Sequence, residues 1–130
     1  ATTSSEQQSV QPVIDAGKLQ ELQSLVREVP VPDSVLETAV KLVHMTRPDS
    51  DMAPELIKKY MSWGAGPRAS QYLILGGKAR ALSQGRYNVS EEDIKALAIP
   101  VLRHRIVNNY AAEADGFTSV RLIDELIKLL

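Results

Sequence analysis

Two glycines and a proline in the segment Trp63–Ser70 constrain the fold most, because they end one element and begin another. Proline is favoured in the first turn of a helix, where its missing N–H has no partner within the helix. We therefore predict a long helix over residues 67–83, with Gly66 as its N-cap. Arg68 would then lie in the first turn, although the positive end of the helix dipole disfavours a cation there.

This corner has the chemistry of a phosphate site. Free N–H groups, the dipole and a guanidinium together attract a phosphate. The sequence predicts that Ala65, Pro67 and Arg68 form such a site, and the alternative is that Arg68 makes a surface ion pair or packs its stem on a neighbouring helix. No general base or nucleophile stands beside Arg68, so its role would be charge stabilisation and not acid–base catalysis.

Composition favours one helical domain and excludes several kinds of site. The 130 residues suffice for one compact domain, and aromatic residues make up only 5 %, so the core must consist of aliphatic side chains. A net charge of −1 argues against nucleic-acid binding through bulk electrostatics. The absence of cysteine excludes disulfides and thiolate metal sites. With no apolar run long enough for a membrane span and no signal peptide, we expect a soluble cytoplasmic protein.

Apolar periodicity predicts an all-α fold, a small bundle of about five to seven helices. We expect residues 1–12 to form a disordered tail or linker and residues 13–130 to form the helical domain of a longer protein. No alternating run is long enough to indicate a sheet. The predicted helices cover residues 16–27, 33–46, 55–61, 67–83, 91–98, 101–105 and 120–129.

Local signals define several helix ends. Asp15 and either Thr118 or Ser119 are predicted N-caps, Ser90 and Asp93 resemble a capping box, and Gly85 fits a helix stop. Pro100 is expected to break or restart a helix. In the long helix, glycines 76 and 77 predict close approach of another backbone or a kink, and the expected buried face consists of Ala69, Tyr72, Leu75, Ala79 and Leu82.

The remaining candidate residues have structural alternatives. Arg103, His104 and Arg105 could contact a phosphate or an acidic neighbour, or form a solvated helix end. Tyr60 and Trp63 could stack on a base, but a core position is the expected one. The acidic residues 91–93 are expected to be helix-start charges and not a metal site. No P-loop or catalytic triad is present, so the chain alone is not expected to catalyse hydrolysis.

Several segments resemble MoxR-type AAA+ ATPases in the same order along the chain. The corner Trp63–Ser70 resembles the G-A-S-P-R-A segment of that family, with Gly66 where the family usually has Ser. The other matching segments are residues 22–31, Thr46-Arg47-Pro48, residues 85–94 and residues 101–105. The resemblance covers nearly everything after about residue 13, and five segments in the same order make it specific.

The resemblance implies the helical lid that follows an α/β core in these ATPases. The P-loop, the Walker B acid and the sensor 1 residue would then lie in that upstream core domain, which would hold most of ATP and its Mg²⁺. Arg68 aligns with the sensor 2 arginine, which reaches the γ-phosphate, and the lid would pass the nucleotide state to neighbouring subunits of a homo-oligomeric ring. Arg103 and Arg105 could face the next subunit.

The resemblance also implies a chaperone-like role with a client protein, for which a von Willebrand factor A domain protein is one candidate. The parent protein would be the ATPase. Two other function classes remain open from the residues alone: a helical DNA-binding module and a stand-alone protein-interaction domain. The near-neutral charge weighs against the first.

Overall fold

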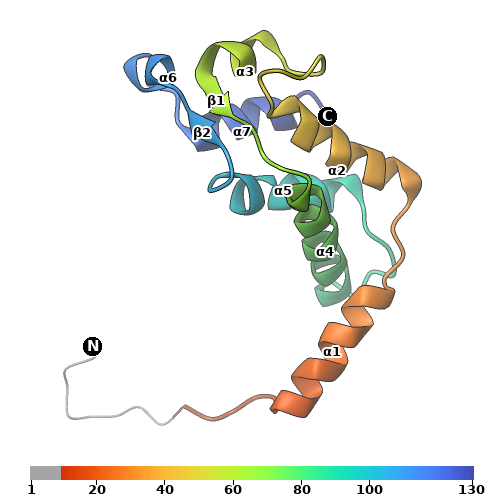
Figure 1. Ribbon diagram of the computed structural model, residues 1–130. Coiled ribbons are helices and arrows are strands. Elements are labelled where there is room, and N and C mark those ends of the chain that lie inside the picture. The colour runs from red at the N-terminus through yellow and green to blue at the C-terminus, as the bar shows by residue number, and fades with distance from the viewer. Residues whose placement is uncertain (1–9) are drawn as a thin grey trace, which may run out of the picture.

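The computed structural model describes residues 10–130, and these residues form a helical bundle with one very short sheet (Figure 1). The predicted all-α class is confirmed. Most of the predicted tail, residues 1–9, lies outside the described residues, and residues 10–12 are exposed and irregular. The elements are α1 (Ala16–Glu28), α2 (Asp33–Met45), α3 (Glu55–Tyr60), β1 (Met61–Trp63), α4 (Arg68–Ser83), α5 (Glu91–Leu102), β2 (Val107–Asn108), α6 (Tyr110–Ala114) and α7 (Ser119–Ile127).

The core is aliphatic, as the composition predicts. Leucine, isoleucine and valine side chains from α2, α3, α4, α5 and α7 are fully buried in one continuous cluster. Burial of such a side chain stabilises the fold by about 1.5–3 kcal/mol relative to its exposure. The largest of these buried side chains are Leu42, Ile57, Leu73, Ile94, Leu102, Leu122, Ile123 and Leu126.

Close approach of α4 to its neighbours explains its two central glycines. A Cβ on Gly76 would lie 2.9 Å from Leu97 Cδ1, and one on Gly77 would lie 2.8 Å from Val89 Cγ1. Both distances are shorter than ordinary carbon contacts. A neighbour does approach closely, but the approaching atoms belong to side chains of α5 and of the segment before it, and not to another backbone as predicted.

The buried face of α4 differs from the predicted one. Its buried residues are Ala69, Leu73, Gly77 and Ala81, whereas Tyr72 and Leu75 are almost half exposed. The prediction was wrong because α4 has apolar residues on two faces and the glycine lies on the face that packs. Only Ala69 is common to the predicted and observed faces.

Two element predictions also need correction. Residues 91–102 form one helix that includes Pro100, so the predicted break is absent. The ring sits in the last turn, where α5 loses one hydrogen bond but keeps its path. A small antiparallel sheet pairs Met61 with Asn108 and Trp63 with Val107. These strands are too short to show alternation in the sequence.

The predicted helix ends are confirmed where the signal is local. Asp15 Oδ1 accepts a hydrogen bond from the Lys18 N–H at 2.7 Å, and Thr118 Oγ1 accepts one from the Arg121 N–H at 3.2 Å. Gly85 ends α4 with φ of +68°, a conformation that side chains other than glycine rarely adopt. Each of these signals spans four residues or fewer, which is why the sequence alone indicates them.

The first helix projects from the body of the molecule (Figure 1). None of its residues is buried, and its length is about 20 Å at 1.5 Å per residue. It contacts mainly α4. No helix within residues 10–130 is long and apolar enough to cross a bilayer.

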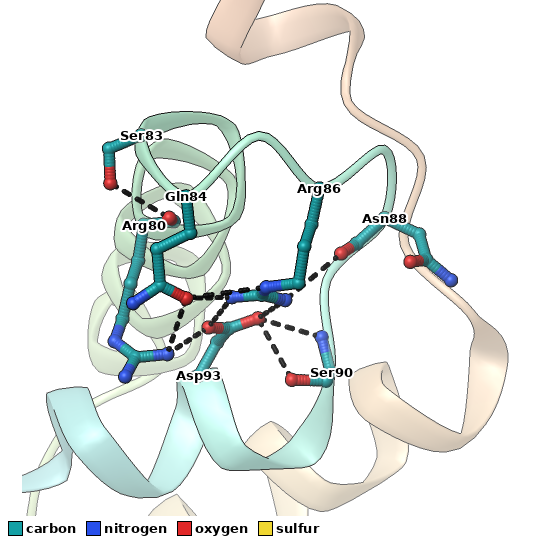
Figure 2. A network of polar contacts seen from close by, with 7 residues as sticks. All are labelled: Arg80, Ser83, Gln84, Arg86, Asn88, Ser90 and Asp93. Atoms are coloured by element: carbon teal, nitrogen blue, oxygen red, sulfur yellow. Dashed lines mark hydrogen bonds and ion pairs between the residues drawn. The ribbon is translucent and has the colours of Figure 1, made fainter.

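A buried carboxylate joins the end of α4 to the start of α5 (Figure 2). Asp93 is fully buried, and its Oδ1 accepts hydrogen bonds from Arg80 Nη1 and Arg86 Nη2, both at 2.5 Å. Its Oδ2 accepts from Arg86 Nη1 at 2.8 Å and from the Ser90 N–H at 2.9 Å. The predicted capping box is therefore present and Asp93 is a helix-start charge as expected, but it is also the centre of a buried ion-pair network that the sequence did not indicate.

These partners hold the pKa of Asp93 well below its usual range. The hydrogen bonds from Arg86 are the largest cause; burial opposes them, and bonds from Ser90 and Arg80 add to them. The pKa of the Arg86 guanidinium is raised in turn by the hydrogen bond to Asp93. A carboxylate that is so fully paired in the folded state stabilises the fold as long as it stays ionised.

We expect the substitution Asp93→Asn to lower the free energy of unfolding by about 3 kcal/mol, because it leaves two guanidinium groups without their counter-charge. Urea denaturation of the chain at pH 7 measures this change. The matched control is Glu92→Gln, a neighbouring carboxylate in the same helical turn whose ion pair with Lys95 is exposed on the glutamate side. That control should change the free energy by less than about 0.5 kcal/mol; equal losses for the two variants would contradict the assignment.

The same network predicts a pH dependence. The pKa of Asp93 is lower in the folded state than its unfolded value of about 3.9, so the unfolded state binds more protons and stability falls on acidification. The wild-type free energy of unfolding should begin to fall below about pH 5, and its advantage over Asp93→Asn should narrow as the pH falls further. Denaturation of both proteins between pH 7 and pH 3 measures the difference, and a constant advantage would refute this explanation.

Candidate functional site

The predicted corner is the turn that leads into α4. The helix begins at Arg68 with Pro67 as its N-cap, one residue later than predicted, and no side chain caps it. Its first-turn bonds run from the Ala69 N–H to the Gly66 carbonyl at 3.0 Å and from the Ser70 N–H to the Pro67 carbonyl at 3.1 Å. The Arg68 side chain is exposed and makes no hydrogen bond or ion pair with any described residue.

A two-point contact holds the corner from the end of α2. The Ala65 N–H donates to Thr46 Oγ1 at 2.9 Å, and the Ala65 carbonyl accepts from Arg47 Nε at 2.9 Å. The Thr46 hydroxyl donates onward to the Val43 carbonyl at 2.6 Å. Thr46 is fully buried and Ala65 is nearly so, so these bonds are shielded from water. We call this set of contacts the Thr46–Arg47 clamp.

Gly64 allows the clamp to close. A Cβ at this position would lie 2.5 Å from the Thr46 carbonyl oxygen and 2.6 Å from the Arg47 Cα. Backbone atoms cannot yield as a flexible side chain can, so only glycine fits here. Gly66 has the opposite environment, since no atom lies within 4 Å of the position that its Cβ would take.

Its helix end distinguishes Arg68 from Arg27 and Arg103. The lack of a ring contact with any described residue distinguishes it from Arg121 in the first turn of α7, whose guanidinium lies 4.2 Å from the centre of the Phe117 ring. Arg27 and Arg103 also lack a side-chain hydrogen bond or ion pair with the described residues. Arg103 follows the end of α5 as its C-cap, and Arg27 lies in the last turn of α1. A cation at a helix C-terminus is stabilised by the dipole, whereas Arg68 sits at the opposite, positive end. The exclusion of a surface ion pair leaves its guanidinium available to an anion.

Of the two candidate aromatic residues, Tyr60 has the expected core position and Trp63 does not. Trp63 is 73 % exposed, so the expectation that it lies in the core was wrong. It sits at the end of the short strand β1, where its side chain is left uncovered. With Arg47, Asp49 and the backbone of the corner it lines a hollow of about 410 Å³. Tyr60 is buried as predicted and stacks on Phe117 at 4.5 Å between ring centroids, so no base can stack on it.

Tyr60 also takes part in a polar contact between α3 and α6. Its hydroxyl donates to Asp115 Oδ2 at 2.7 Å, and Lys59 Nζ lies 2.7 Å from the same hydroxyl. The hydrogen bond from Tyr60 is the main cause of the lowered pKa of the Asp115 carboxyl, and Lys59 adds to it. The pKa of Lys59 is raised, first by Tyr60 and then by Asp115. This contact fastens two short helices and leaves no free group for catalysis.

The basic run after α5 is partly occupied by internal contacts. The Arg105 guanidinium lies 4.8 Å from the centre of the Tyr72 ring, donates to the Val101 carbonyl at 2.5 Å and contacts His104. Arg103 is exposed. Within this basic run, Arg105 is therefore held by contacts inside the domain, whereas Arg103 is accessible to a partner.

The described residues contain no group of three or more histidine, aspartate or glutamate side chains that could hold a metal ion. Within residues 10–130 the donor set thus fits a phosphate at Arg68 but does not fit Mg²⁺. The residues that the sequence did not indicate as part of the corner's support are Thr46 and Arg47. The contact of Thr46 with Ala65 spans 19 positions, and that of Arg47 spans 18. The only sequence signal for these two residues is that they belong to one of the segments that resemble the MoxR-type family in the same order.

Comparison with known proteins agrees with this geometry. Residues 54–126 match the family model described as the AAA lid domain. The chain is 29 % identical over 116 residues to "Chaperone MoxR1" of Mycobacterium tuberculosis, and the match covers 89 % of this chain and 31 % of that protein.

A solved structure gives the same relationship in three dimensions. The crystal structure of a candidate ATPase from Cytophaga hutchinsonii superposes with a TM-score of 0.82 at 31 % identity, covering 88 % of this chain and 34 % of that one. The chain thus spans about a third of the length of the relatives that it matches. The family model covers more than half of the chain. The chain therefore belongs to the AAA lid domain family, and its similarity to the two relatives agrees with its sequence resemblance to MoxR-type proteins.

Proposed function

We propose that this lid senses the phosphates of ATP through Arg68, in the role of a sensor 2 arginine. The observation that carries the proposal is an exposed guanidinium without any partner among the described residues, on a turn whose backbone is held by the Thr46–Arg47 clamp. A charged donor at a helix N-terminus suits an anion. Pro67 and Ala65 contribute by shaping the turn.

Most of the nucleotide site lies outside this lid in the proposal. A core domain with a P-loop would bind ATP and its Mg²⁺, since the described residues supply one phosphate ligand and no metal ligands. Arg68 would bind the terminal phosphate only when lid and core close together. Closure and reopening of the lid would then pass the nucleotide state to neighbouring subunits.

The same reasoning gives the assembly its form. An ATP-dependent lid that moves against a neighbour fits a homo-oligomeric ring with a chaperone-like role, and the name of the M. tuberculosis relative points the same way. Arg103 is exposed and could face the next subunit; Arg105 would act there only after leaving Tyr72. The client is a protein that this lid does not identify, and a von Willebrand factor A domain protein is one candidate.

The first test is the substitution Arg68→Ala in the parent ATPase. Loss of a hydrogen bond from a charged group costs about 1.5–3 kcal/mol, so kcat for ATP hydrolysis should fall about 10- to 150-fold. The melting temperature should not change, because Arg68 has no internal contact to lose. The matched control is Arg121→Ala, an exposed arginine in the first turn of α7. Unchanged steady-state turnover in Arg68→Ala would refute the proposal.

The second test uses the 130-residue chain by itself. We expect calorimetry to detect weak ATP binding or none, because the lid supplies a single arginine and lacks the other phosphate contacts of a complete site. Reattachment of the core domain should restore tight binding. Tight one-to-one binding of ATP by the lid alone would show that the lid holds a complete site, which contradicts the division proposed here.

A further inference from the structure

We propose that Thr46 and Arg47 are positioning residues for Arg68, and that they fix where its guanidinium can reach by holding the backbone of Ala65. The inference rests on the proposed function of Arg68 and adds to it the device that sets the sensor. Neither side chain needs to touch the nucleotide. Both act through the turn that joins β1 to α4.

The hydrogen bonds leave Ala65 no freedom to rotate. Its N–H and its carbonyl are both engaged, by Thr46 Oγ1 and by Arg47 Nε, each at 2.9 Å. The two partners are consecutive residues, so both backbone groups of Ala65 form hydrogen bonds with one short segment. The Thr46 hydroxyl must accept from Ala65 and donate to Val43 at the same time, a combination that a hydroxyl allows and a methyl group does not.

The first turn of α4 depends on this support. No side chain caps the helix, and its earliest bonds go to the carbonyls of Gly66 and Pro67. No atom lies near the position that a Gly66 Cβ would take, and glycine restricts its own backbone least, so order in the turn has to come from its two sides. On one side the clamp fixes Ala65, and on the other Ala69 and Leu73 are fully buried in the core. Arg68 lies between these two fixed points.

Close backbone contact makes the clamp a mechanical link as well. Because a Cβ on Gly64 would overlap the Thr46 carbonyl and Arg47, the end of α2 and the turn touch without intervening side chains. A shift of the end of α2 must therefore move the turn. The position of α2 would in this way set the position of the sensor.

The experiment compares steady-state ATP hydrolysis by variants of the parent ATPase. We expect Thr46→Val to lower kcat about tenfold or more with little change in KM, because a guanidinium displaced by about 1 Å loses its aligned contact. Thr46→Ser keeps the hydroxyl and should restore kcat. The control Thr38→Val removes a hydroxyl of the same helix that bonds only to the Ser34 carbonyl, and it should leave kcat unchanged.

A double-mutant cycle separates positioning from mere stability. If Thr46 acts through Arg68, Thr46→Val combined with Arg68→Ala should be no slower than Arg68→Ala alone. Multiplied losses would overturn the inference, and so would wild-type kcat in Thr46→Val. If Thr46→Val does not fold, Arg47→Ala takes its place in the cycle, because Arg47 is half-buried and gives up one hydrogen bond. Wild-type kcat in Arg68→Ala would instead refute the proposed function.

Discussion

The buried carboxylate of Asp93 is the interaction on which the arrangement of α4 depends. A buried charge must be paired with an opposite charge. Arg80 on α4 and Arg86 on the loop that follows both form ion pairs with this carboxylate, and the Ser90 N–H at the start of α5 donates a hydrogen bond to it. Three consecutive segments thus share one centre. This fixes the C-terminal end of α4 in angle and position, and the two glycines let the helix lie against Leu97 and Val89 along its middle.

Once one end of α4 is fixed, its other end becomes a defined point in space. Arg68 sits at that end, about 23 Å away along the 16-residue helix. The turn before it is held separately by Thr46 and Arg47, which directly follow α2. Both supports use buried polar contacts at the two ends of one helix, so the helix behaves as a strut between an ion-pair centre and the proposed sensor.

The parts of this arrangement that the sequence indicates are the local ones. Asp15, Thr118 and Gly85 act within a single turn, so their roles could be predicted from neighbouring residues. The face of α4 could not, since Leu75 is as apolar as Leu73, the Tyr72 ring can also pack in a core, and only the packing of α5 decides between them. Asp93 looked like an ordinary helix-start charge because its partners Arg80 and Arg86 meet it only after α4 and α5 fold together. Trp63 was misplaced because nothing in its local sequence tells that its strand lies uncovered.

The same distinction explains why Arg68 could be proposed as a site residue from the sequence while its support could not. An arginine after Gly-Pro at a helix start is a local contradiction of dipole preference, and such contradictions tend to mark functional positions. Thr46 and Arg47 satisfy every local rule at the end of α2, where a threonine bonding back to Val43 is unremarkable. Their contribution appears only when a distant turn brings the Ala65 peptide between them. A residue proposed to bind phosphate can therefore stand out in the sequence because it contradicts a local preference. The residues that position it follow every local preference and do not stand out.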